Sequence, residues 1–214
     1  MRSTKWGRLV AAIVSASTAW VQADWQPGDG HKMHYPQMPD EEGWDVNATF
    51  PANLADDWQC SQSGPITEIH FWGSWRDMNG DQVGDVGVIL SFSISIYADI
   101  PADQSPTGYS MPGVPLREWE ITAFAAVPID PPTFEAWFDP TLPPGLVIPN
   151  DHHEYFQYNI VNLPSLVPDP FLQVEGTVYW LSISANVLDP LNTQWGWKSS
   201  RDHWNDDAVW NLLP

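Results

Sequence analysis

The segment from Lys198 to Trp210, KSSRDHWNDDAVW, concentrates side chains that could do chemistry. It holds three aspartates, a histidine, a lysine and an arginine, although the whole chain has only 8 Lys and Arg residues. The neighbours Asp202 and His203 resemble a general-base pair. Residues adjacent in sequence seldom face each other, however, and no nucleophile motif such as G-x-S-x-G occurs. We therefore expect Arg201 to pair with an aspartate, and we assign no catalytic residue.

Two aspartate doublets, Asp56-Asp57 and Asp206-Asp207, lie near the two ends of the predicted domain. Side chains of adjacent strand residues point to opposite faces, so one carboxylate of each doublet can serve a given site. If the first and last strands run side by side, these carboxylates repel unless a cation lies between them or one binds a proton. Asp57, Asp206 and Asp207 are therefore candidate ligands of a structural Ca²⁺. Hydrogen bonds from backbone amides and from Arg201 are the alternative.

A second candidate calcium site is the segment DMNGDQVGD, between two predicted strands. The residues at the ligand positions of a calcium loop are Asp77, Asn79, Asp81 and Asp85. Gln82 stands where such a loop needs glycine, and Val88 stands where it needs a bidentate acid. A turn without metal favours the same Asp, Asn and Gly residues, and it is the competing interpretation.

Aromatic residues suggest a different kind of site. The chain has 14 tryptophans, which could stack on sugar rings or fill the core. Trp72 and Trp180 would form a carbohydrate-binding platform if both lie on the outer faces of their strands, with His70 on the same strand face as Trp72. The segment 150–154, NDHHE, offers ligand types for zinc, but it lacks the spacing of a zinc motif, and we interpret it as a polar turn.

The elements that must position these residues are strands. Eight segments alternate between apolar and polar residues or are rich in β-branched and aromatic residues, and turn residues separate them. They are 66–75, 89–99, 116–126, 133–139, 154–163, 177–187, 195–199 and 208–213. We predict an all-β fold, an antiparallel two-sheet β-sandwich with a jelly-roll-like arrangement and about eight strands. A closed barrel is the nearest alternative.

The N-terminus predicts export. Residues 1–23 combine three basic residues with a short apolar run and small residues before the expected cleavage after Ala23, as in a secretory signal peptide. The run is too short for a retained transmembrane helix. Residues 24–43 read as an extended, irregular N-terminal arm, in which His31 and His34 are solvated, and residues 44–214 form one β-sandwich domain. We expect a secreted or extracytoplasmic protein.

The charge of the chain limits its partners. It carries 27 acidic and 8 basic residues, and three of the basic residues belong to the predicted signal peptide. This excess opposes binding to nucleic acid or to anionic membranes, because phosphate binding requires Lys and Arg. It favours cations, which would offset the self-repulsion of the folded chain. Cys60 is the single cysteine, so no intramolecular disulfide can form, and we expect a buried, inert thiol.

Several long motifs identify a resemblance. LADDWQC (54–60), HFWGSW (70–75), YADIP (97–101) and GWKSSRDHWNDDAVW (196–210) resemble an uncharacterised, secreted bacterial β-rich domain family, from about Gly43 to Trp210. The resemblance implies an exported β-rich module of unknown function, and it carries no activity or ligand. Members often continue into a sorting tail, which leaves any anchoring of this chain open.

Three functions follow as hypotheses. The first is an exported, non-catalytic β-sandwich module for extracellular binding or cell-surface architecture, with structural Ca²⁺ and with a polysaccharide or surface protein as partner. The second is a carbohydrate-binding module that uses exposed tryptophans. The third is a carboxylate-dependent hydrolase, which would need two acids held roughly 5–10 Å apart beside a cleft.

Overall fold

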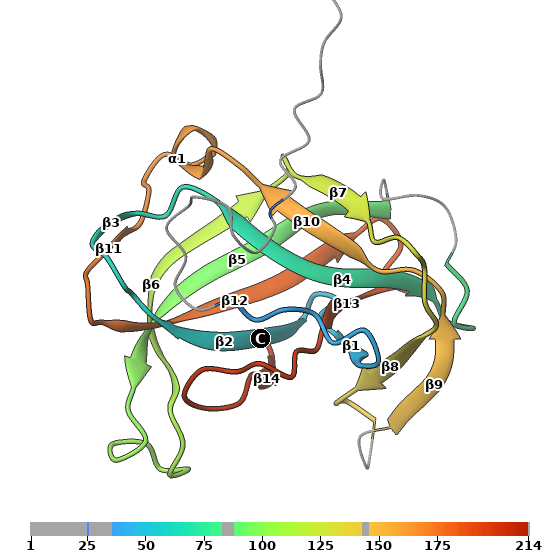
Figure 1. Cartoon of the computed structure of the whole chain (residues 1–214), viewed down its shortest axis with the longest axis horizontal. Helices are drawn as coiled ribbons and strands as arrows, with labels where there is room; N and C mark the ends of the chain where they lie inside the picture. Colours follow the sequence, from blue (N-terminus) through green and yellow to red (C-terminus); the bar gives the residue numbers. More distant parts are fainter. Residues whose placement is uncertain (1–24, 26–35, 83–87, 143–145, 214) are drawn as a thin grey trace, which may run out of the picture.

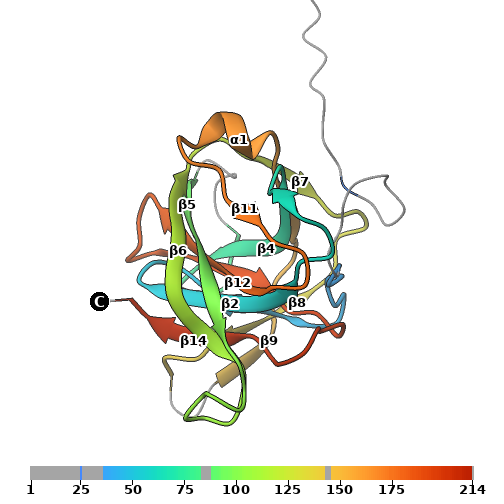
Figure 2. The same cartoon turned by 90° about the vertical axis from the view of Figure 1, so that its left-hand side faces the viewer.

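The computed structural model describes residue 25 and residues 36–82, 88–142 and 146–213, which form two stacked β-sheets (Figures 1 and 2). Seven strands make the larger sheet: β1 (Trp44–Asn47), β4 (Ile69–Asp77), β7 (Ala125–Pro128), β8 (Glu135–Asp139), β9 (Leu146–His152), β10 (Phe156–Ile160) and β13 (Thr193–Lys198). Their order is β7-β10-β4-β13-β1-β8-β9. The penultimate strand along the chain, β13, thus lies at the centre of this sheet.

Five strands make the second sheet: β2 (Ala52–Gln59), β5 (Ile89–Ile100), β6 (Met111–Ile121), β12 (Val178–Val187) and β14 (Val209–Leu212). Their order is β14-β2-β12-β5-β6, and Figure 2 shows them side by side. A small sheet pairs β3 (Gly64–Pro65) with β11 (Leu172–Gln173), and one short helix, α1 (Leu163–Leu166), lies beside it. The pairing of β2 with β14 and of β1 with β13 joins the two ends of the described chain.

The all-β, sandwich-like fold is confirmed, and the number of strands is corrected. Each of the eight predicted segments contains a strand, but the described residues form fourteen. The segment 116–126 contributes to two strands in different sheets, because the chain crosses between the layers after Ile121. Strand β9 lacks alternation and contains Pro149, so its pattern did not indicate a strand. The expectation of purely antiparallel sheets is also wrong, since β1 and β8 are parallel.

Parts of the N-terminal predictions lie outside the described residues. These are the signal peptide (1–23) and residues 24 and 26–35 of the arm, which include His31 and His34. Within the arm, Trp25 and residues 36–43 are described, and Pro39 forms an isolated bridge with Ser200. The described end of the arm is therefore held against the segment that follows β13.

The space between the sheets is filled by aromatic and branched side chains. Phe71 of β4, Phe92 of β5, Tyr158 of β10 and Trp195 of β13 form one cluster, with ring centroids 4.9–5.9 Å apart. Edge-to-face pairs of this kind contribute about 0.5–1.5 kcal/mol each beyond the burial of apolar area. Because the rings come from both sheets, this cluster fixes how the layers stack. The predicted alternation in 66–75 and 89–99 is what points these rings inward.

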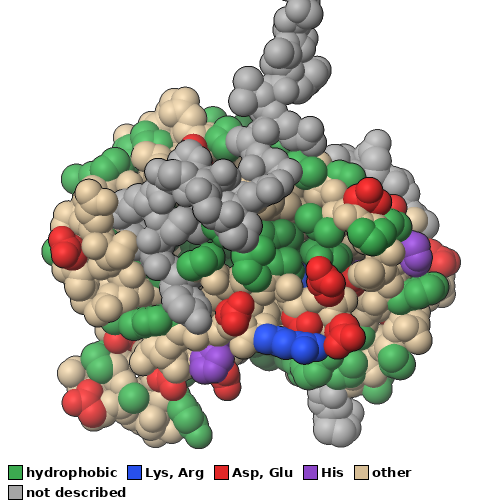
Figure 3. Space-filling model, in the orientation of Figure 1, with side chains coloured by type: hydrophobic (Ala, Val, Ile, Leu, Met, Phe, Trp, Pro, Cys, Tyr) green, Lys and Arg blue, Asp and Glu red, His purple; other side chains and the backbone are tan. Residues whose placement is uncertain are grey.

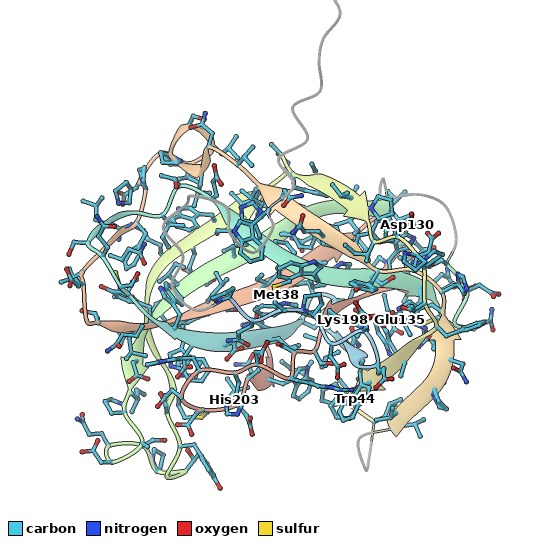
Figure 4. All side chains as sticks on the ribbon, viewed as in Figure 1. Met38, Trp44, Asp130, Glu135, Lys198 and His203 are labelled. Atoms are coloured by element: carbon cyan, nitrogen blue, oxygen red, sulfur yellow. The ribbon has the colours of Figure 1, made fainter. Side chains whose placement is uncertain are left out.

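A second buried layer, made of charged side chains, attaches the β8–β9 hairpin. Arg76 contacts Asp151 at 3.0 Å, Asp151 contacts His152 Nδ1 at 3.1 Å, and His152 Nε2 contacts Asp45 at 3.0 Å. Lys198 and Glu135 form a further, fully buried ion pair nearby (Figure 4). Breaking a buried pair by removing one partner typically costs about 3–5 kcal/mol, because an uncompensated charge is left behind. The segment NDHHE is thus the end of a strand within an ion network, and its interpretation as a turn is wrong.

Two glycines allow the close approach of β4, β13 and β1. A Cβ atom at Gly73 would lie 2.2 Å from the carbonyl oxygen of Gly196 and 2.7 Å from the ring of Trp195. A Cβ atom at Gly196 would lie 2.7 Å from the ring of Trp137 and 2.8 Å from Cβ of Asp45. Neither position has room for a side chain, because backbone and packed rings occupy it. The sheet is therefore tightest where β4 and β13 cross these glycines.

The charged layer predicts a pH-dependent contribution to stability. Burial alone would lower the pKa of His152, but its hydrogen bonds to Asp151 and Asp45 raise it to about 9. The protonated histidine therefore stabilises the fold below pH 6.5, and this contribution is lost as the pH rises through 9. We expect His152→Gln to lower the free energy of unfolding by about 3 kcal/mol below pH 6.5, with a smaller effect above pH 9. Urea denaturation at several pH values measures this difference.

The neighbouring exposed residue His153 provides the control. We expect His153→Gln to leave the free energy of unfolding within about 0.5 kcal/mol of the unsubstituted chain, as for most surface changes. If His152→Gln has the same effect at acid and alkaline pH, His152 does not carry a charge in the folded protein.

Candidate functional site

A cleft of about 440 Å³ opens between β4 and the neighbouring strands β13 and β1. The ladder between β4 and β13 runs from Asp77 to Gly73, after which β13 continues along β1. The beginning of β4 thus separates from β13, and the inner face of β2 and β12 forms the floor of the opening. Figure 3 shows hydrophobic side chains gathered in the middle of this side of the molecule, with acidic side chains below them. The cleft thus opens where β4 and β13 of the larger sheet separate.

Four indole rings line the cleft: those of Trp25, Trp58, Trp72 and Trp197. Trp25 and Trp72 meet edge to face, with centroids 6.1 Å apart and planes at 74°. The backbone carbonyl of Trp25 accepts a hydrogen bond of 2.9 Å from Gln157 Nε2, which fixes the arm to β10. The indole N–H of Trp58 donates to Gln173 Oε1 at 3.2 Å. Aromatic walls with a few oriented polar groups are the usual composition of a ligand site.

The polar side chains of the upper wall come from the start of β4. His70 Nδ1 lies 2.6 Å from Asn159 Oδ1, and His70 Nε2 lies 3.4 Å from Glu68 Oε2. Both ring nitrogens therefore face acceptor oxygens, which holds the imidazole in one orientation. Trp72 lies on the same strand face two residues further along, and both residues line the cleft. Of the predicted ligand-binding residues, the structure brings His70 and Trp72 together.

Trp180 is placed elsewhere. It belongs to β12 in the other sheet, where it pairs with Asp57 and Tyr97 in the ladders and is fully buried. Its indole N–H donates to Asp99 Oδ1 at 2.9 Å. Trp72 and Trp180 thus lie in different sheets and do not form a joint platform.

The aspartate doublet on β2 divides between the two faces of its strand. Asp56 is opposite Leu181, which packs toward the core, whereas Asp57 is opposite Trp180. Burial raises the pKa of Asp56 to about 6 and repulsion from Asp207 adds to it, while hydrogen bonds from the Asp57 N–H and from Gln37 oppose this rise. Asp56 lines the floor of the cleft. It is a carboxyl group that can carry or release a proton near neutral pH.

The second doublet meets the first, because β14 runs antiparallel to β2 with Val209 opposite Ala55. Asn205 Nδ2 donates to Asp57 Oδ2 at 2.7 Å, and Asp206 Oδ2 accepts the backbone N–H of Ser110 at 2.6 Å. Burial raises the pKa of Asp57 to about 7, and repulsion from Asp56, Asp99 and Asp206 adds to it, while the Asn205 hydrogen bond opposes it. His203 lies in the same loop below β2 (Figure 4).

No preformed metal centre is present among the residues that the structure describes, since no three His, Cys, Asp or Glu side chains are grouped to hold an ion. Asp77 Oδ1 accepts backbone N–H bonds from Asn79 (2.7 Å) and Asp81 (3.0 Å), which hold the pKa of Asp77 below its usual range. Asp77, Asn79 and Asp81 thus lie in a hydrogen-bonded turn. Asp85, the fourth predicted ligand, lies outside the described residues.

Arg201, which was predicted to pair with an aspartate, pairs with two acidic residues. It contacts Asp40 and Glu42 of the arm, each at 2.9 Å, and not an aspartate of its own loop. The sequence did not single out Trp25, Trp58, Trp197 or Glu68 for the site. None of these residues belongs to a motif in its own segment. They come together in one cleft only through long-range contacts of the fold.

Comparison with known families gives one match. Residues 33–212 match the family model described as a domain of unknown function, DUF7901. The chain belongs to this family. The resemblance to an uncharacterised domain family is thereby confirmed, and the DUF7901 match includes every described residue that lines the cleft apart from Trp25. No curated protein and no solved structure matches the chain. Among the described residues, no helix is long and apolar enough to cross a membrane.

The buried carboxyl of Asp57 generates a prediction. Its raised pKa means that the folded state holds a proton that the unfolded chain releases, so the contribution of Asp57 to stability is highest below pH 3.8 and falls as the pH rises through 7. We expect Asp57→Asn, in the presence of EDTA, to raise the free energy of unfolding above pH 7 by about 2–4 kcal/mol. The gain should disappear below pH 3.8, where the aspartate is protonated in both states. Urea denaturation measures both values.

Asp202→Asn is the matched control, because Asp202 is exposed in the loop between β13 and β14. We expect this variant to show no comparable gain above pH 7. A loss of stability in Asp57→Asn above pH 7 would mean that the fold needs the ionised carboxylate.

Proposed function

We propose that this chain is an exported, non-catalytic, jelly-roll-like β-sandwich module that binds an extracellular saccharide in the cleft beside β4. The observation that carries the proposal is the composition of the cleft, where indole rings and fixed hydrogen-bonding groups share one opening. A sugar ring presents apolar C–H faces and a rim of hydroxyl groups. A site for it therefore needs aromatic surface together with polar groups of defined orientation.

The geometry of the cleft supports this ligand. Its volume of about 440 Å³ falls within the range of small-molecule sites, which is roughly 300–1,000 Å³. Glu68, held beside His70 on one wall, and Asp56 on the floor can form hydrogen bonds to hydroxyl groups. Trp72 is half-buried and retains exposed ring surface. The proposed export is supported by residues 1–23, which have the basic, apolar and small-residue pattern of a secretory signal peptide.

A carboxylate-dependent hydrolase is the second candidate. Asp56 favours it, because a carboxyl with a pKa of about 6 in a cleft that also contains Glu68 resembles the acid of a glycoside hydrolase. Release of new reducing ends from a glycan, abolished by Asp56→Asn, would establish hydrolysis. Binding without release of products supports the non-catalytic module.

Structural Ca²⁺ is a further part of the proposal, at the meeting point of Asp57 and Asp206. The support is that Asp57 Oδ1 is buried without a hydrogen-bond partner among the described residues. The carboxylates would have to close around the ion, since no ligand group is preformed in the described part of the chain. Such closure would neutralise the repulsion that acts on Asp57.

The calcium proposal predicts a metal-dependent melting temperature. Above pH 7, we expect Ca²⁺ to raise the melting temperature of the unsubstituted protein relative to EDTA, because an ion bound to the folded state stabilises it. Asp57→Asn should melt at the same temperature with Ca²⁺ and with EDTA. Differential scanning calorimetry measures both proteins. Equal melting of the unsubstituted protein in Ca²⁺ and EDTA removes calcium from the proposal.

The saccharide proposal predicts the effect of a single indole. We expect Trp72→Ala to weaken binding of the best ligand from a glycan array by about tenfold or more, because truncating an aromatic anchor commonly costs more than 1 kcal/mol. Isothermal titration calorimetry measures the dissociation constant, and circular dichroism confirms that the fold is retained.

Trp44→Ala is the control, since Trp44 is exposed on β1 and does not line the cleft. Its affinity should equal that of the unsubstituted protein. The absence of binding to every member of a broad glycan array, or equal losses in Trp72→Ala and Trp44→Ala, would contradict the proposal.

A further inference from the structure

We propose that the cleft selects saccharides with protonated amino groups, such as β-1,4-linked glucosamine oligomers, over neutral saccharides of the same shape. This inference rests on the proposed saccharide binding and names the chemical class of the ligand. It is carried by the charges around the cleft, by the unpartnered buried indole N–H of Trp25 and by the aromatic walls.

The charge balance of the cleft is negative. Its acidic lining residues come from β2, the approach to β4 and the C-terminal loop, and they are Asp56, Asp57, Glu68 and Asp207. Among the described lining residues, Lys198 is the one lysine or arginine, and it already forms an ion pair with Glu135 in which both side chains are fully buried. The positive charge of Lys198 is thus paired with Glu135. Apart from the lining histidines His70 and His203, a ligand in the opening meets carboxylates without a matching cation among the described residues.

Asp56 is one of the acids that line this cleft. It lies on the floor of the cleft, and its hydrogen bonds come from the backbone N–H of Asp57 and from Gln37. A carboxylate has about four acceptor sites, so it can accept further bonds from an ammonium group. Burial and, more weakly, repulsion from Asp207 raise the pKa of Asp56, while attraction to His203 lowers it. An ammonium group placed between Asp56 and Asp207 would replace that repulsion by two attractions.

One buried polar atom of the lining points independently to a ligand. Trp25 is 6% exposed, and its Nε1 has no hydrogen-bond partner in the described part of the chain. Buried polar groups are normally paired, and an unpaired one is destabilising. The indole N–H is a donor, which matches a ligand that carries hydroxyl oxygens.

The aromatic walls suit an amino sugar as well as a neutral one. An ammonium group within about 6 Å of an indole face is attracted by the ring quadrupole, with about 0.5–2 kcal/mol of stabilisation depending on desolvation. The half-buried rings of Trp58, Trp72 and Trp197 provide such faces beside the acidic residues. The same rings can stack on the apolar C–H face of any hexose. The preference for an amino sugar over a neutral sugar therefore comes from the acidic residues.

The overall acidity of the protein must be separated from the effect of the cleft. With a formal charge of −19, the chain attracts any cation at low ionic strength. The double variant Asp56→Asn/Glu68→Gln removes two charges from the cleft. The matched control, Glu118→Gln/Glu120→Gln, removes two charges from the outer, exposed face of β6. Both variants change the net charge equally, and only one changes the cleft.

The experiment is isothermal titration calorimetry with three trimers that share a β-1,4-linked backbone: glucosamine, N-acetylglucosamine and glucose. We expect the glucosamine trimer to bind about tenfold more tightly than the other two, equivalent to one partly desolvated charge contact. The preference should vanish in Asp56→Asn/Glu68→Gln and persist in the control variant. Circular dichroism verifies that both variants fold.

Each other outcome overturns the inference in a distinguishable way. Equal affinity for the three trimers contradicts the selection of amino sugars and leaves saccharide binding intact. A preference that survives Asp56→Asn/Glu68→Gln assigns it to the net charge of the protein. A failure to bind these trimers, together with an empty glycan array, overturns the proposed function itself.

Discussion

The close approach of β4 to β13 at Gly73 and Gly196 is the constraint on which the rest of the structure depends. At this crossing the backbone and the rings of Trp195 and Trp137 occupy the space that side chains would need. Immediately beyond Gly73 the ladder between the two strands ends, and β4 turns away toward β10. The closely packed crossing of the two glycines is therefore also the place where the cleft begins. The course of β4 at Gly73 accounts both for the close packing on one side and for the cleft on the other.

Polar side chains are distributed in two layers with different roles. The layer around His152 and the Lys198–Glu135 pair is closed, and its charges compensate one another inside the protein. The layer around Asp56 is open to the cleft, and its charges are compensated only in part. A network whose charges balance one another holds strands in register, whereas an excess of one sign leaves interactions for a ligand. This difference separates the structural aspartates of the chain from those that can act in recognition.

Local patterns predicted the strands, and long-range contacts defined the site. The alternation around Phe92 and Ile94 and around Phe71 identified core strands, because a half-buried strand has a period of two. Strand β9 was missed, since Pro149 and a polar end hide its pairing with β8. The approach of the two aspartate doublets could be predicted, because it requires only that the first and last strands of the domain pair. The cleft did not follow, because it joins β2, β4 and β13 across more than half of the chain, and no local pattern encodes that juxtaposition.

The position of β13 has a consequence for how the molecule is assembled. Although this strand is the penultimate one in the sequence, it is the shared neighbour of β4 and β1. The two halves of the larger sheet thus have no hydrogen-bonded connection until the last part of the chain arrives. Contacts of such long sequence separation form slowly, because loop closure must precede them. During synthesis from the N-terminus, the larger sheet would stay incomplete until the last part of the chain is made. A truncation before Thr193 would remove the middle of this sheet, not its edge.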